Sequence, residues 1–124
     1  MNREDVRFDL EERLIRFAVA IVTLTNKFPI NFAVQHFSKQ LIRSGTSPAL
    51  NYAESQSAES RNDFIHKLSI ALKELRETMV CLKIIQRSDL IRDQSQLTQT
   101  IDECNQLISI LVTSIKTAKK PRSS

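Results

Sequence analysis

The sequence is poor in the residues that build tight turns and β-structure. Its 124 residues include one glycine, three prolines and no tryptophan. Hairpins, barrels and sandwiches need many tight turns, so this composition disfavours a β-rich fold. A single glycine also excludes the glycine-rich loops that bring backbone amides against the phosphates of a nucleotide. Long helices with few breaks are the simplest interpretation, and the chain is long enough for one core.

Patterns for metal binding, disulfides and membrane spans are missing as well. Cys81 and Cys104 match no zinc-ligand spacing, and two thiols make a poor disulfide framework, so we expect them to be reduced. His36 and His66 have no partner at a metal-binding spacing on their own segments. We therefore expect no metal, no cofactor and no small-molecule substrate. The first residues lack a signal-peptide pattern and no apolar run reaches about 18 residues, so we expect a cytoplasmic protein without membrane contact.

Apolar side chains recur in alternating steps of four and three along most of the chain. This spacing is typical of a helix that buries one face. The first such segment runs from Leu10 to Phe28 and ends at Pro29. A second, predicted to be capped by Asn31, carries Val34, Phe37 and Leu41 inward.

Two further segments show the same spacing. Gly45 and Pro48 predict a break in the second helix, with a resumed turn after it. Ser60 or Asn62 is predicted to cap a third helix. The inward residues of the third and fourth helices are predicted to be Phe64, Leu68, Ala71, Leu75, Thr78, Leu82 and Ile85, and then Leu97, Ile101, Cys104, Ile108, Leu111 and Ile115. Together the segments predict an all-α, up-down four-helix bundle, with one domain over residues 1–118 and a basic disordered tail over 119–124.

Positive charge gathers on one side of the third predicted helix. At about 100° per residue, Lys73, Arg76, Lys83 and Arg87 share one strip with Val80 between them. The tail adds Lys116, Lys119 and Lys120. Such a strip is either a solvated face that keeps the bundle soluble or an edge that binds the phosphates of a nucleic acid.

Two helices carry more apolar side chains than one bundle can bury. On the third helix Ile70, Cys81 and Ile84 lie outside the core stripe. On the first helix Ile15, Val19 and Val22 do the same. A second apolar stripe on a helix predicts an interface between subunits, so we expect a homo-oligomer rather than a monomer.

Glu74 and Glu77 are carboxylates one helical turn apart, which is a spacing that an acid and base pair can use. Such a pair more often accepts hydrogen bonds from an arginine on a neighbouring helix. The chain offers no nucleotide loop, metal motif or activated nucleophile beside them, so we expect a protein that is not an enzyme.

The central segment resembles a known family of four-helix-bundle proteins, whose founding members are encoded within intervening sequences of bacterial 23S ribosomal RNA genes. The resemblance covers residues 10–115 in layout and about 40–85 in motif. The residues that carry it are Gln40-Leu41-Ile42-Arg43-Ser44, Ser47, Asn51-Tyr52-Ala53-Glu54, Asp63-Phe64-Ile65-His66-Lys67-Leu68 and Ala71-Leu72-Lys73-Glu74-Leu75-Arg76-Glu77-Thr78.

The resemblance implies a homopentamer with a basic, nucleic-acid-binding surface and no enzymatic activity. A related branch, the accessory proteins of diversity-generating retroelements, engages a reverse transcriptase and its RNA. The resemblance also implies a polar signature, which here consists of Gln40, Arg43, Ser44, Ser47, Asn51, Glu54, Glu74 and Glu77. A structural role accounts for it: Arg43 offers a planar fork of donors to Glu74 or Glu77, while Ser47 and Asn51 satisfy backbone groups near the predicted break.

Two hypotheses for the function follow. In the first, an oligomeric bundle presents its cations to RNA or DNA without reading bases, because few aromatic side chains are available for stacking. In the second, the apolar stripes and the Glu74 side of the third helix dock subunits or a larger enzyme such as a reverse transcriptase.

Overall fold

Four antiparallel helices make up the part of the chain that the structure describes. The computed structural model describes the backbone of residues 3–121 and the side chains of residues 9–121. The helices are α1 (Arg3–Asn26), α2 (Phe32–Ser55), α3 (Arg61–Arg87) and α4 (Ser95–Lys119), with no strand among the described residues. The prediction of an all-α, up-down four-helix bundle is thus confirmed. None of the described helices is both long and apolar enough to cross a membrane.

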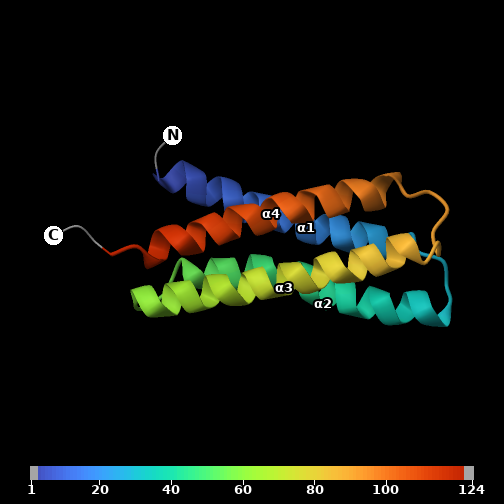
Figure 1. The fold of residues 1–124 in the computed structure, drawn as a ribbon, viewed down its shortest axis with the longest axis horizontal. Helices are drawn as coiled ribbons and strands as arrows, with labels where there is room; N and C mark the ends of the chain where they lie inside the picture. The colour runs from blue at the N-terminus through green and yellow to red at the C-terminus, as the bar shows by residue number, and fades with distance from the viewer. Residues whose placement is uncertain (1–2, 122–124) are drawn as a thin grey trace.

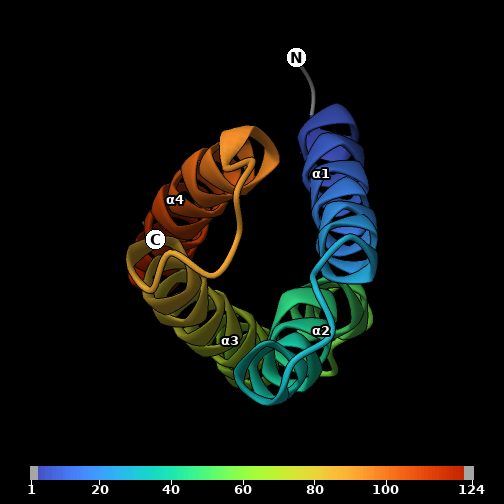
Figure 2. The same ribbon diagram turned by 90° about the vertical axis from the view of Figure 1, so that its right-hand side faces the viewer.

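The helices follow one another around the bundle (Figures 1 and 2). The α1–α2 and α3–α4 connections lie at one end, and the α2–α3 connection lies at the other end with the C-terminus of α4 (Figure 1). Contact is most extensive between α2 and α3 and least extensive between α1 and α4. α2 and α3 therefore form the most extensive helix–helix contact in the described part of the chain.

The predicted apolar stripes form the core. In the third helix the predicted inward residues from Leu68 to Ile85 are fully covered. The apolar residues of the first predicted segment are all buried, namely Leu10, Leu14, Phe17, Ile21, Leu24 and Phe28. Phe37, Phe64, Ile101 and Ile108 are partly buried against them. In α4 the buried face is wider than predicted, because Thr100 and Leu107 are also enclosed.

Side-chain caps begin two of the helices as predicted. Asn31 Oδ1 accepts a hydrogen bond from Val34 N at 2.9 Å. For α3 the cap is Ser60 and not Asn62, since Ser60 Oγ accepts from Asp63 N at 3.0 Å. Both caps satisfy amides that the first turn of a helix leaves unpaired.

The predicted break at Gly45 and Pro48 is wrong. α2 continues through both residues to Ser55, and both are buried. A proline inside a helix removes one backbone hydrogen bond, which generally costs about 3 kcal/mol, so packing must offset that loss here. Gly45 lies against α1 so closely that a Cβ placed on it would be 2.7 Å from Ile21 Cγ1. This glycine permits close approach of two helices and does not end one.

The C-terminal end of α4 is held by the start of α3. Arg61 Nε donates to the carbonyl of Ala118 at 2.5 Å, and Arg61 Nη2 donates to the carbonyl of Lys120. Lys119, predicted as the first residue of a disordered tail, is the last residue of α4. Residues 122–124 of the predicted tail lie outside the described residues.

Candidate nucleic-acid and protein interface

A polar network joins α2 to α3 around Arg43. Its Nη1 lies 3.0 Å from Glu74 Oε2, and its Nη2 lies 2.7 Å from Glu77 Oε2 and 3.3 Å from Gln40 Oε1. The hydrogen bond to Glu77, followed by the charge of Glu74, raises the pKa of the Arg43 guanidinium. The proposed fork of donors is therefore present, and it engages both carboxylates.

A buried pair of hydroxyls lies beneath this network. Ser44 Oγ donates to the carbonyl of Gln40 at 2.9 Å and lies 2.8 Å from Thr78 Oγ1. Each hydroxyl has one proton: Ser44 donates its proton to the Gln40 carbonyl, and Thr78 shares its proton between the Glu74 carbonyl, 2.8 Å away, and Ser44 Oγ in a Thr78–Ser44 hydrogen bond. This bond crosses from α3 to α2 inside the core and sets the register between the two helices.

The remaining signature residues also make structural contacts. Asn51 Nδ2 donates to the Ser47 carbonyl at 3.1 Å and to Ser47 Oγ at 2.8 Å, one turn along the uninterrupted helix. Glu54 accepts from Lys67 Nζ at 2.9 Å and so ties α2 to α3 a second time. These contacts give the polar signature a role in the fold.

The cations of α3 stand apart from this network. Lys73, Arg76, Lys83 and Arg87 are exposed, and they make no ion pair or side-chain hydrogen bond with any other described residue. The nearest acids on the same helix, Glu74 and Glu77, are engaged by Arg43. We call these four residues the α3 ridge. It spans about 21 Å at the rise of a helix.

The predicted cations do not form one continuous surface. Lys116, Lys119 and Lys120 lie at the end of α4 that Arg61 holds, whereas Arg87 ends α3. Arg61 and Arg87 are about 39 Å apart along the helix. The structure therefore keeps the α3 ridge together and separates the C-terminal lysines from its Lys83 and Arg87 end.

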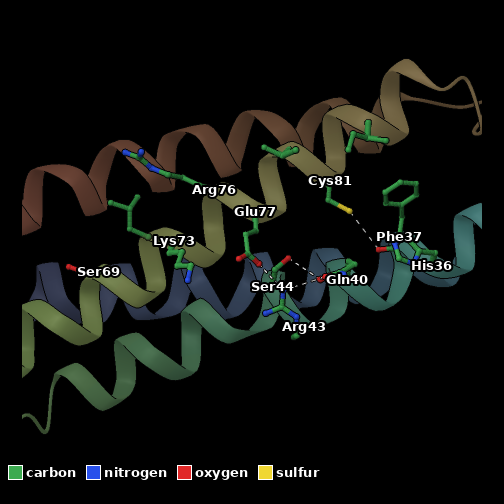
Figure 3. A pocket seen from close by; sticks show the side chains of 13 residues that line it. His36, Phe37, Gln40, Arg43, Ser44, Ser69, Lys73, Arg76, Glu77 and Cys81 are labelled. Atoms are coloured by element: carbon green, nitrogen blue, oxygen red, sulfur yellow. Dashed lines mark hydrogen bonds and ion pairs between the residues drawn. The ribbon is translucent and has the colours of Figure 1, made fainter.

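An open groove of about 950 Å³ lies between α2 and α3 (Figure 3). Apolar side chains line much of it, namely Phe37, Leu72, Val80, Cys81 and Ile84. Lys73 and Arg76 line the same groove, so the first half of the α3 ridge lies within it. Lys83 and Arg87 do not line the groove, and Arg87 lies past Ile84, the last residue of α3 in its lining. The groove thus combines apolar surface with unpaired positive charge.

The two cysteines are buried and free. Burial raises the pKa of the Cys81 thiol to about 11 and that of Cys104 to about 12. Cys81 is 7% exposed, which corrects the prediction that it lies outside the core. The reason is that α2 covers it, with Sγ 3.8 Å from the Phe37 carbonyl. Both thiols are protonated at neutral pH and therefore poor nucleophiles.

The other predicted interface residues remain at least partly accessible. Ile15, Val19 and Val22 form an exposed stripe along α1, and Ile84 is exposed on α3 while Ile70 is partly buried. The sequence interpretation missed exposed apolar residues elsewhere, namely Ile30, Phe32, Ile42 and Leu50. The predicted break in α2 hid Leu50, since a continuous 3.6-residue period across Gly45 places it off the buried face.

Comparison with known proteins places the chain in a family. Residues 8–113 match the model of the 23S rRNA-intervening sequence protein family. The chain belongs to this family. The predicted resemblance is thereby confirmed over nearly the whole bundle.

A solved relative supports this membership in the 23S rRNA-intervening sequence protein family. A Bacteroides thetaiotaomicron protein of unknown function, described as from the S23 ribosomal protein family, is 36% identical to this chain with a TM-score of 0.77. The match covers 86% of this chain and 98% of the relative. No curated protein matches the sequence.

In the described part of the chain, no three His, Cys, Asp or Glu side chains gather as a metal ion would require.

Proposed function

We propose that this family member is a non-enzymatic homo-oligomer that binds nucleic acid, chiefly RNA, through its exposed cations without reading base sequence. One observation supports this above the others: the four α3 ridge residues have no partner among the described side chains, although acids lie on the same helix. Because Glu74 and Glu77 are ion-paired with Arg43, they do not neutralise the ridge cations, which are therefore free to attract phosphate.

The physical basis of binding is the release of counterions. Each phosphate that a lysine or arginine neutralises frees condensed cations, so affinity falls as salt rises. Base-specific recognition of single strands uses stacking on exposed aromatic rings, and the ridge carries none. The proposed binding is therefore governed by charge and backbone shape.

The oligomer is the second part of the proposal. The α1 stripe exposes three aliphatic side chains on one face of a small subunit, and the resemblance implies five subunits. Repeating the ridge around an assembly would multiply the phosphate contacts, so a modest surface on each subunit would bind a long polymer with useful avidity.

The test is a salt titration of binding to unrelated RNAs, followed by fluorescence anisotropy. Replacing Lys83 and Arg87 with glutamine removes two ridge cations and should reduce the slope of log affinity against log salt by about 1.4 to 1.8. The matched control replaces Arg16 and Lys39 with glutamine as well. This variant loses the same charge from exposed positions on α1 and α2. Equal slopes in the two variants, or no binding by the parent protein at low salt, would refute the proposal.

A second candidate is a docking platform for a larger protein such as a reverse transcriptase. It is favoured by Ile30 and Phe32, which remain 90% and 91% exposed at the α1–α2 connection. Nuclease digestion separates the candidates, because protein docking survives it and association through shared RNA does not.

A further inference from the structure

Phe32 stands out among the described aromatic side chains. Phe17, Phe28 and Tyr52 are buried in the core, whereas Phe32 is 91% exposed. It is the first residue of α2 and directly follows the cap Asn31. A lone exposed apolar residue is ordinary, so the surroundings of this ring decide whether it can bind a ligand.

A second ring lies one turn further along the same face of α2. His36 follows Phe32 by four residues, which places the two side chains on one side of the helix, about 6 Å apart along its axis. His36 is exposed, and its ring lies edge-on to Phe37 with the ring centroids 5.2 Å apart (Figure 3). We call Phe32 and His36 the α2 rings.

The end of the α3 ridge lies beside the α2 rings. α2 and α3 are antiparallel, and Cys81 is level with Phe37 because its Sγ lies 3.8 Å from the Phe37 carbonyl. From this pair, Phe32 lies about 7.5 Å toward the start of α2, and Arg87 lies about 9 Å toward the end of α3. Phe32 and Arg87 are therefore at nearly the same level on neighbouring helices. Both are exposed to solvent.

The charge around the α2 rings favours a polyanion. Residues 28–53 contain no aspartate or glutamate, so the first half of α2 offers no carboxylate that would repel phosphate. Asp89 and Asp93 lie in the α3–α4 connection at the same end of the bundle (Figure 1), but the cations there outnumber them. These cations are Lys27, Arg87 and Arg92.

We propose that the α2 rings stack on unpaired bases of a single-stranded nucleic acid while Lys83 and Arg87 bind its phosphates. A base in a duplex has both faces covered by its neighbours, whereas an unpaired base can lay one face on an aromatic ring. Every base has such a face, so stacking tolerates any sequence. The inference rests on the proposed function and adds the class of ligand, which is a single strand rather than a duplex.

Two strands of equal charge separate stacking from charge. One is an oligoadenylate of about 12 nucleotides, and the other is a ribose-phosphate strand of the same length without bases. The parent protein should bind the oligoadenylate more tightly, by about 5- to 150-fold for each base that stacks. Phe32→Leu keeps an apolar side chain but removes the ring. It should therefore lose about 5- to 150-fold in affinity for the oligoadenylate and bind the base-free strand as the parent does.

Three controls accompany this variant. Phe32→Trp should retain the affinity for the oligoadenylate, because it keeps a ring. Ile30→Ala should change neither affinity, since Ile30 is 90% exposed in the same connection but has no ring. Phe32→Leu should also leave binding to a long duplex RNA unchanged. Circular dichroism verifies that each variant folds, as the exposure of both positions predicts.

The outcomes distinguish stacking from binding by charge. Equal affinity of the parent for the two strands would overturn the inference and leave the proposed function intact. Equal losses from Ile30→Ala and Phe32→Leu would also overturn it, because they indicate a general apolar contact such as protein docking. Ring-dependent binding of the oligoadenylate without binding of the base-free strand would support stacking and refute the proposed function. Binding of neither strand would refute both.

Discussion

At the scale of single residues, polar side chains at the centre of the molecule are all engaged. Every described side-chain nitrogen or oxygen that is fully buried has a hydrogen-bond partner. Thr78 and Ser44 pair across the α2–α3 contact, and Arg43 gathers both carboxylates at its edge. Because an unpaired buried polar group costs about 1 to 3 kcal/mol, the buried pair of Ser44 and Thr78 favours one register of α2 against α3.

Gly45 gives a prediction at this scale. A Cβ at Gly45 would be 2.7 Å from Ile21 Cγ1 and 3.3 Å from Ile21 Cβ, so rotation of the isoleucine cannot relieve the clash. Gly45→Ala should destabilise the fold by about 1 to 2 kcal/mol, since overpacking exceeds the gain of about 1 kcal/mol in helix propensity. Urea denaturation measures the change.

A double variant checks the cause. Ile21→Ala should cost less stability in the Gly45→Ala background than in the parent, because the added methyl group fills part of the space that isoleucine leaves. If Gly45→Ala alone stabilises the protein, close approach of α1 and α2 is not the reason for the glycine.

At the scale of secondary-structure elements, local signals and packing both decide where helices begin and end. α1 ends at Asn26, just before Pro29, and both predicted caps start helices where the sequence places them. Within α2, however, burial of Gly45 and Pro48 against neighbouring helices outweighs their tendency to interrupt a helix. Propensity is a local term, and packing of an amphipathic face overrides it.

The N-cap of α3 gives a prediction for an element. Ser60→Ala removes the acceptor for Asp63 N and should lower the free energy of unfolding by about 1 kcal/mol. Asn62→Ala is the matched control, since Asn62 lies just inside the helix and should change stability by only a few tenths of a kcal/mol. Thermal unfolding compares them, and a larger effect at Asn62 would contradict the capping role of Ser60.

At the scale of the whole molecule, the four helices pack against one another to different extents. α1 and α4 have the least extensive contact of the neighbouring pairs, and polar side chains form hydrogen bonds and an ion pair across that contact. Arg13 Nη2 lies 2.6 Å from Glu103 Oε1 and 3.2 Å from Gln106 Oε1, and Lys27 Nζ lies 3.1 Å from Gln96 Oε1. The hydrogen bond to Glu103 raises the pKa of Arg13, although burial opposes it.

The prediction at this scale is that loss of the Arg13–Glu103 pair increases local opening between α1 and α4. Arg13→Gln removes the pair with Glu103, which should cost up to about 1 kcal/mol and speed hydrogen exchange in α1 and α4 more than in α3. Arg16→Gln is the control, because its partner Glu12 lies on the same helix. Mass spectrometry of exchange measures both, and equal exchange in the two variants would show that the pair does not close the bundle.

Helix number, direction and buried faces were readable from the residues alone. Alternating steps of four and three describe one face of an isolated helix, and that face needs burial whatever covers it. The α3 ridge was predictable for the same reason, since its residues share a strip of a single helix. The pairing of Arg43 with Glu74 and Glu77 was foreseeable as chemistry, because a guanidinium fork suits two carboxylates.

Other features depended on contacts between segments distant in sequence. Continuity of α2 comes from the approach of Gly45 to Ile21, and burial of Cys81 comes from its cover by Phe37. Separation of the C-terminal lysines from Arg87 follows from which helix ends meet. Inclusion of Lys73 in a groove follows from the packing of α2 beside α3. Periodicity describes one helix at a time, so these relations between helices required the packed structure.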